Sequence, residues 1–337
     1  MALDFDQADI ARIANQGKRF HFGISYLDDA LGAFMPYDFV VIGARTGRGK
    51  TALALHLALN AAAQQRRVVF YALEARRFEV EQRLLYGEII RVGRELYPSM
   101  SGRLPRYRGW LMGELNRVDG EDFARMLTDE AKENLRKKTA FFDLRYLGFT
   151  QDPTKFAVGL VRDIEANASH DSADLVVLDH LHYFAVSHGT ETEAVQVAIH
   201  KFNEIVVKHN VPMLVVSHLR KGSSSFGATA SRLPSVDDFH GHSDIVKVAT
   251  TVVTLAPQIE DATAEKFITL FQVLKAREAG EVTPYVARHS FITAKNAYSR
   301  EYTLLSSVPD ANGAMTLEVP KRIPSWARHH VDAREGA

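Results

Sequence analysis

The most constraining feature of the chain is a glycine-rich loop between an apolar run and a helical pattern. The apolar run covers Phe39 to Ile42, the loop reads from Ala44 to Thr51, and a helical pattern follows from 52 to 63. A strand, a glycine-rich loop and a helix in this order form the structural context of a P-loop. Ala44 stands where the motif usually has its first glycine. The segment predicts a site for a nucleoside triphosphate.

The P-loop assigns roles to its last two residues. Lys50 would reach the β- and γ-phosphates, and Thr51 would offer its hydroxyl to Mg²⁺. The following helix would point its positive end at the same phosphates. ATP and Mg²⁺ are therefore the expected cofactors, and the expected ATP-binding residues are Ala44, Arg45, Thr46, Gly47, Arg48, Gly49, Lys50 and Thr51.

Two further apolar runs end in carboxylates. Leu175 to Leu178 leads to Asp179, which is the Walker B form and provides a second ligand for Mg²⁺ beside Thr51. The run 68–73 leads to Glu74, where a base could polarise the attacking water, although a solvated helix cap is the alternative. We expect both carboxylates at one edge of a sheet, because ligands of open α/β sheets bind at the carboxyl ends of strands.

Apolar runs alternate with helical patterns along most of the chain. This alternation is typical of an α/β fold with a largely parallel central sheet flanked by helices. The parallel strands are expected at 39–42, 68–73, 175–178, 213–217 and 251–255. Later runs at 267–275, 282–288 and 290–294 predict antiparallel hairpin strands at one edge.

Three more polar residues are candidates for the site. The run 213–217 carries His218 to the carboxyl edge, where it could bond the γ-phosphate or be a structural histidine. Lys275 and Arg277 alternate along an expected strand, so they share one face, which in isolation suggests a solvated edge. The pairs His180/His182 and His240/His242 predict no metal site, because each lacks further ligands.

Composition limits the partners and the compartment. The chain of 337 residues has 41 basic and 41 acidic residues, so any DNA-binding surface must be local. No cysteine is present, which excludes disulfides and thiolate chemistry. Residues 1–20 carry charges throughout and no later stretch could span a bilayer. These features favour a cytoplasmic protein that does not bind membranes.

These motifs together resemble the DnaB-type ring helicases and their phage helicase-primase and mitochondrial relatives, over about 22–302. The similarity lies in the opening segment 22–31, in the GAR...GKT loop, in Leu73-Glu74 and in Ser217-His218-Leu219. Lys275-x-Arg277 followed by Gly280 is similar to the family's piston lysine and arginine finger. The resemblance implies a RecA-like ATPase core that lacks the family's N-terminal collar or primase domain.

The resemblance also implies roles for the site residues. Glu74 would orient water, His218 would sense the γ-phosphate, and Lys275 and Arg277 would reach the nucleotide of a neighbouring subunit. Hydrolysis would then require a ring, expected as a hexamer. DNA would be contacted by the loop after the sensor strand, at Arg220, Lys221 and Gly222.

The resemblance divides the chain into three parts. Residues 1–20 would form a linker helix that packs on its own core or on a neighbouring subunit, 21–308 the RecA-like domain, and 309–337 a tail. The stretch 91–116 is interpreted as an irregular insertion that stacks on single-stranded bases, binds a partner or packs between subunits. The basic tail is expected to be disordered or to dock on another replication protein.

The leading functional hypothesis is an ATP-dependent DNA helicase of the DnaB type that encircles single-stranded DNA in replication. It would act in a bacterial cell or a phage-infected host, with a replication or loader protein as a possible partner. The first alternative is a RecA-like switch ATPase that binds DNA in recombination, helicase loading or target marking without unwinding it. The second is a nucleotide-dependent assembly factor that binds another protein.

Overall fold

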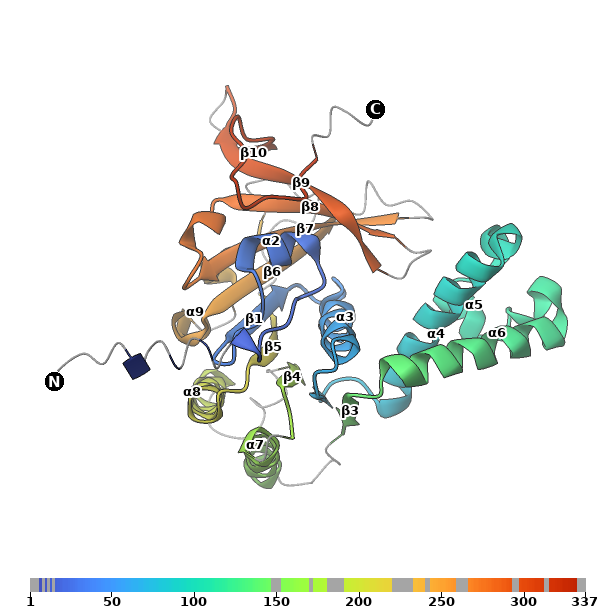
Figure 1. Cartoon of the computed structure of the whole chain (residues 1–337), viewed down its shortest axis with the longest axis horizontal. Helices are drawn as coiled ribbons and strands as arrows, with labels where there is room; N and C mark the ends of the chain where they lie inside the picture. The colour runs from blue at the N-terminus through green and yellow to red at the C-terminus, as the bar shows by residue number, and fades with distance from the viewer. Residues whose placement is uncertain are drawn as a thin grey trace.

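A sheet of ten strands organises the described part of the chain (Figure 1). The computed structural model describes residues 6–7, 10, 13, 16–146, 153–169, 172–180, 191–219, 233–239, 243–258, 266–292, 297–311 and 315–331. The strand order across the sheet is β10-β9-β8-β7-β6-β1-β5-β4-β2-β3. The strands are β1 (Phe39–Ala44), β2 (Val68–Ala72), β3 (Phe142–Arg145), β4 (Leu175–Asp179), β5 (Met213–His218), β6 (Thr251–Gln258), β7 (Lys266–Ala276), β8 (Tyr285–Ile292), β9 (Ala297–Pro309) and β10 (Met315–Glu318).

The predicted division of the sheet is confirmed. The strands β6, β1, β5, β4, β2 and β3 pair in parallel, whereas β7, β8, β9 and β10 continue the sheet in antiparallel pairs from β6 outward. The five parallel strands expected from their apolar runs are all present, because strands covered on both faces are apolar along their whole length. The half-buried strands β3, β9 and β10 were not predicted.

Helices cover both faces of the sheet. They are α2 (Ser25–Leu31), α3 (Lys50–Ala63), α4 (Arg77–Leu96), α5 (Tyr107–Leu111), α6 (Asn116–Lys138), α7 (Pro153–Ser169), α8 (Glu191–His209) and α9 (Ser243–Val248), with short 3-10 turns at Pro98–Arg103, Val236–Asp238 and Gly280–Val282. In β1, Val40 and Ile42 pack in the core with α2 and α3. Phe39 and Val41 point to the other face and pack in the core with α7, α8 and α9. The alternation places β1 at the centre of both cores.

The predicted irregular insertion at 91–116 is wrong, because this segment belongs to a helical hairpin. The helices α4 and α6 pack against each other and project away from the sheet beside α3 and β3 (Figure 1). They enclose a small core of their own that includes Ile89, Val92 and Leu127. Buried Glu88 accepts hydrogen bonds from Arg91 of α4 and Lys138 of α6, which ties the base of the hairpin.

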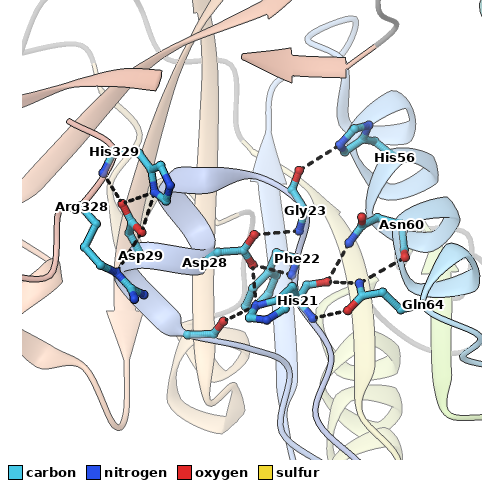
Figure 2. Close-up of polar contacts among 11 residues, drawn as sticks. His21, Phe22, Gly23, Asp28, Asp29, His56, Asn60, Gln64, Arg328 and His329 are labelled. Atoms are coloured by element: carbon cyan, nitrogen blue, oxygen red, sulfur yellow. Dashed lines mark hydrogen bonds and ion pairs between the residues drawn. The ribbon is translucent and has the colours of Figure 1, made fainter. Parts of the chain in front are cut away.

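The segment before α2 is fastened to α3, the helix that follows the P-loop (Figure 2). The Asp28 carboxylate accepts hydrogen bonds from the backbone N–H groups of Phe22 and Gly23 at 2.6 and 3.1 Å. From α3, the side-chain amides of Asn60 and Gln64 donate to the carbonyl oxygen of His21. The segment that resembles the family's opening thus positions α3. Farther upstream, Ile10 and Ile13 are exposed.

The predicted disordered tail is also wrong for the parts of 309–337 that the structure describes, 309–311 and 315–331. The strand β10 pairs with β9 (Figure 1). The Trp326 ring packs on Tyr26 of α2, with ring centroids 6.3 Å apart. Figure 2 shows the anchor, where the buried Asp29 carboxylate accepts a hydrogen bond from the His329 backbone N–H at 2.9 Å. The same carboxylate oxygen accepts from the Tyr302 hydroxyl at 2.9 Å, so α2, β9 and the C-terminal segment meet at one buried charge.

This buried carboxylate predicts a stability effect. Asp29→Ala leaves the Tyr302 hydroxyl and the His329 N–H without their acceptor, so we expect a loss of about 3 kcal/mol in the free energy of unfolding. Urea unfolding measures this loss, and limited proteolysis reports release of the C-terminal segment. The control is Arg328→Ala, since the Arg328 side chain is 70% exposed and its ion pair with Asp29 is worth less than about 1 kcal/mol. Equal losses in both variants would refute the anchoring role.

None of the helices described here has the length and apolar character needed to cross a bilayer.

Candidate nucleotide site

The residues predicted from the P-loop and from the ends of β2, β4 and β5 meet at the carboxyl edge of the parallel strands. In the sheet, Ala44 of β1 lies opposite His218 of β5, and Ala72 of β2 lies opposite Asp179 of β4. Glu74 follows β2 by two residues, and its backbone N–H donates to the Asp179 carbonyl oxygen at 3.4 Å. The sheet therefore brings together side chains from four strand ends that are far apart in the sequence.

The P-loop has the backbone shape that phosphate binding needs. Gly47 and Gly49 have φ angles of 72° and 85°, a left-handed conformation that residues with a Cβ adopt only at a cost. The helix α3 then begins at Lys50, so its first N–H groups face the loop. The Lys50 ammonium is buried and donates to the Arg45 carbonyl oxygen at 3.0 Å. Burial lowers the pKa of Lys50, whereas the nearby Glu74 and Asp179 carboxylates raise it.

The residues expected to hold Mg²⁺ fit that ion. Asp179 is 1% exposed, and burial raises its pKa to about 6, while the Thr51 hydroxyl lowers it. Although Thr51 is near, neither oxygen of the Asp179 carboxylate has a hydrogen bond of good geometry within the described residues. A buried carboxylate with free oxygens beside a hydroxyl matches the oxygen ligands that Mg²⁺ prefers. Thr51 and Asp179 would hold the ion beside the phosphates.

Glu74 and His218 lie close together, with an unpredicted third residue between them. The Nε2 atom of His180 is 3.1 Å from Oε2 of Glu74. The rings of His180 and His218 are 4.2 Å apart and nearly perpendicular. His218 also contacts the P-loop, where its Nδ1 lies 3.4 Å from the Thr46 hydroxyl. The strand ends therefore form a continuous polar wall from the P-loop to Glu74.

The two imidazoles of this wall are neutral at pH 7. Burial and, to a smaller extent, the Lys50 charge lower the pKa of His180 to about 4. Burial, His180 and Lys50 lower the pKa of His218 to about 4 as well. A neutral imidazole has one donor and one acceptor nitrogen, so His218 is able to donate a hydrogen bond to a phosphate oxygen without repelling Lys50.

Sequence reasoning missed the position of His180 in this wall. In the sequence, His180 stands out as one of a pair with His182, two residues away. The useful signal was instead its place directly after Asp179 at the end of β4, since the neighbouring strand ends carry Glu74 and His218. His182, His240 and His242 lie outside the described residues.

Lys275 and Arg277 lie near the amino ends of the parallel strands β1 and β6, whereas the P-loop follows the carboxyl end of β1. The backbone N–H of Arg277 donates to Thr250, just before β6, and the N–H of Thr250 donates to Phe39 at the start of β1. Because β1 rises about 3.3 Å per residue, the P-loop begins roughly 16 Å farther along. An arginine side chain is too short to span that distance. The two cations are therefore outside the nucleotide site of their own chain.

The contacts of these two cations differ. The Lys275 ammonium donates to the carbonyl oxygens of Val246 and Lys247 at the end of α9, at 2.6 and 2.8 Å. Arg277 lines a pocket with Tyr37, Asp38 and Glu278, and its charge lowers the pKa of the Asp38 carboxyl, which burial raises. The strand β7 ends at Ala276 and contains a register shift opposite Lys275, so the expected regular strand through both cations does not occur.

The predicted DNA contacts Arg220, Lys221 and Gly222 lie outside the described residues. The two ends of that loop are described, and they pair through a bridge between Leu219 and Phe239. The Phe239 ring packs so closely on Gly43 of β1 that a Cβ there would lie 2.6 Å from it. Both ends of the loop are therefore fixed against the strand that leads into the P-loop.

The first part of the chain matches a known family. Residues 20–97 match the family described as DnaB-like helicase C terminal domain. A stretch of 84 residues is 38% identical to the replicative DNA helicase DnaB of Treponema pallidum. This alignment covers 25% of the chain and 18% of that helicase, so the chain spans less than a fifth of the length of this curated relative. The family match includes the P-loop and Glu74, whereas Asp179, His218 and Arg277 lie beyond it.

Solved structures share the fold over most of the chain. The solved ATPase domain of another protein superposes with a TM-score of 0.63 at 16% identity, covering 88% of this chain and 99% of that domain. A KaiC-like protein from Pyrococcus horikoshii superposes with a TM-score of 0.51 at 16% identity, covering 83% of this chain and 97% of that protein. Residues 20–97 are therefore similar in sequence to the C-terminal domain of DnaB-like helicases, and the chain is RecA-like in fold.

Proposed function

We propose that the chain is an ATP-dependent DNA helicase of the DnaB type. It assembles into a ring, as a hexamer, around single-stranded DNA and moves the DNA by hydrolysing ATP at subunit interfaces. It acts in replication, in the cytoplasm of a bacterial cell or a phage-infected host. The family match over 20–97 and the RecA-like fold support the helicase class.

The observation that carries the interface mechanism is that the site residues lie at two opposite ends of the parallel strands. Lys50, Asp179 and Glu74 lie at the carboxyl ends, whereas Arg277 lies near the amino ends. A guanidinium beside the transferring phosphoryl group neutralises the charge that develops in the transition state, and supplies about 10³ to 10⁵ in rate. Arg277 can do this only for the nucleotide of another copy. Subunit association would then be a condition for turnover.

Each residue of the edge next to the P-loop has a definite task in this mechanism. Lys50 exchanges its hydrogen bond to the Arg45 carbonyl for contacts with the β- and γ-phosphates. Thr51 and Asp179 would hold Mg²⁺, which would neutralise phosphate charge. Glu74 orients the attacking water and accepts its proton. His218 donates a hydrogen bond to the γ-phosphate and loses this partner after hydrolysis. Because His218 ends β5 and the DNA loop begins two residues later, the loss of this hydrogen bond is transmitted to the loop.

DNA binding rests on the loop after β5. Arg220 and Lys221 neutralise backbone phosphates, and the backbone N–H of Gly222 assists them, so no base preference is expected. One sequence feature favours the switch ATPase instead. The loop after the Walker B strand, 182–192, contains histidines and a glutamate but no lysine or arginine. Without these cations it neutralises no DNA phosphates, so the affinity for DNA is lower.

The test is ATP hydrolysis by the full chain while single-stranded DNA is titrated in, with unwinding of a forked duplex and oligomer size measured on the same samples. We expect stimulation by DNA, strand separation and a ring. Lys50→Ala should abolish all nucleotide-dependent activity. Replacing Arg220 and Lys221 with alanine should weaken DNA binding and reduce its salt dependence, since each neutralised phosphate contributes about 0.7 to the slope.

The outcomes separate the three functions. Stimulation without unwinding would replace the helicase by the switch ATPase. Hydrolysis that ignores DNA over the whole titration would favour the assembly factor, whose partner is another protein. Unchanged turnover in Lys50→Ala would refute the nucleotide site itself.

A further inference from the structure

Three side chains of the polar wall form a cluster of metal-ligand type. Glu74, His180 and His218 each offer one ligand atom, and these atoms all lie within 4.8 Å of one another. We call this cluster the histidine–glutamate triad. It contains two imidazole nitrogens and one carboxylate oxygen, which is a ligand set that zinc takes in catalytic sites.

The backbone places the triad firmly. His218 is the last residue of β5, and His180 directly follows the adjacent strand β4. Glu74 lies two residues beyond β2, on the other side of β4. Backbone hydrogen bonds from Leu73 and Glu74 to the Asp179 carbonyl hold the end of β2 against β4. Ligands fixed by three neighbouring strands lose little conformational freedom when an ion binds, which favours affinity.

The distances fit a transition metal after closure of the ligands. Zinc bonds to nitrogen and carboxylate oxygen are about 2.0 to 2.2 Å, so two ligands of one tetrahedral ion lie about 3.4 Å apart. His180 Nε2 and Glu74 Oε2 are already 3.1 Å apart. The ligand atoms, which all lie within 4.8 Å of one another, must close by at most about 1.4 Å. The Glu74 side chain is 54% exposed and has room to move, whereas His180 is 9% exposed and forms the fixed side.

The triad and the Mg²⁺ ligands differ in donor type. Thr51 and Asp179 offer oxygen only, which suits Mg²⁺. Imidazole suits zinc and its neighbours in the first transition series, so the two sites select different ions. His180 binds through the nitrogen that faces Glu74 once its proton occupies the other ring nitrogen. The Lys50 charge opposes a cation here, and the carboxylates of Glu74 and Asp179 offset it.

We propose that Glu74, His180 and His218 bind Zn²⁺ in the nucleotide-free chain, with water in the remaining position. A bound ion takes the Glu74 carboxylate as a ligand, so that it no longer accepts a proton from water. Where the proposed hydrolysis holds, Zn²⁺ would therefore slow it. The binding itself does not depend on that function, because it needs neither nucleotide nor DNA.

The experiment is titration of Co²⁺ into the nucleotide-free full chain in a buffer with excess Mg²⁺. We expect the visible absorption of a four- or five-coordinate Co²⁺ site at one ion per chain, and its loss when Zn²⁺ displaces the Co²⁺. His180→Gln and Glu74→Gln should each weaken binding by at least 10- to 100-fold, the range seen even for residues that only support a ligand. Circular dichroism and urea unfolding confirm that each variant is folded.

The matched control is His209→Gln. His209 lies 3.6 Å from the Glu165 carboxylate in a histidine–carboxylate pair, and neither residue belongs to the triad. Its loss should leave Co²⁺ affinity unchanged. A chain without the Co²⁺ band, or folded His180→Gln with full affinity, would overturn the proposal. DNA-stimulated hydrolysis measured without Zn²⁺ is a separate result, so failure of the zinc site and failure of the helicase assignment are distinguishable.

Discussion

Replacing Arg277 with alanine should leave ATP binding intact and reduce DNA-stimulated hydrolysis by about 10³-fold or more. The reason is geometric. Arg277 extends from the edge of the sheet where β1 starts, whereas the P-loop follows the end of β1. The guanidinium therefore contributes nothing to the nucleotide site of its own chain. Fluorescent-nucleotide binding and steady-state turnover, measured on the same preparation, separate the two effects.

Mixing variants tests the contribution between subunits directly. An Arg277→Ala subunit keeps its own P-loop, Asp179 and Glu74, and a Glu74→Ala subunit keeps its own Arg277. Where the second lies against the nucleotide of the first, one complete site forms, so a mixture should regain activity that neither variant has alone. Arg300→Ala, at an exposed position of β9, is the control and should behave as wild type. No recovery at any mixing ratio would contradict the interface assignment.

The second large effect is expected at Glu74. Glu74→Gln should retain ATP and Mg²⁺ binding and lose about 10² to 10⁴ in turnover, because an amide accepts no proton from the attacking water. Single-turnover hydrolysis with preloaded nucleotide measures the chemical step alone. Glu81→Gln is the matched control, since Glu81 is an exposed carboxylate of α4 that pairs with Arg77 close to the same strand end. Turnover in Glu74→Gln equal to that of the control would remove Glu74 from the catalytic step.

The parts of the fold that the sequence predicts are those where one local pattern determines the structure. The strands β1, β2, β4 and β5 are buried on both faces, so each is an uninterrupted apolar run. The P-loop is recognisable because its glycines, lysine and threonine all serve one ligand. The carboxyl edge then follows from the strand-end positions of Asp179 and His218.

Other parts depend on contacts between distant residues. The tail pattern around Trp326 and His329 is basic and polar, and nothing in it indicates a buried carboxylate about 300 positions earlier. The prolines and glycines of 91–116 predict irregular structure, yet most of them lie in the turns between α4, α5 and α6, and Gly93 and Gly109 lie within α4 and α5. The kink of α6 at Asp119 and Gly120 also obscured its helical periodicity. The roles of Lys275 and Arg277 remain predictions from a resemblance.

The helical hairpin has a consequence for measurement. The helix α4 begins three residues after Glu74 and has 20 residues, so it extends about 30 Å from that point. Suppose that a shift of about 1 Å near Glu74 turns this helix by roughly 10°. Because the helix is about 30 Å long, its far end would then move by about 5 Å. A small movement of the backbone near Glu74 would thus produce a larger displacement at the far end of the hairpin. A dye at Met112, which is 75% exposed in the turn between α5 and α6, would report such movements of the hairpin in real time.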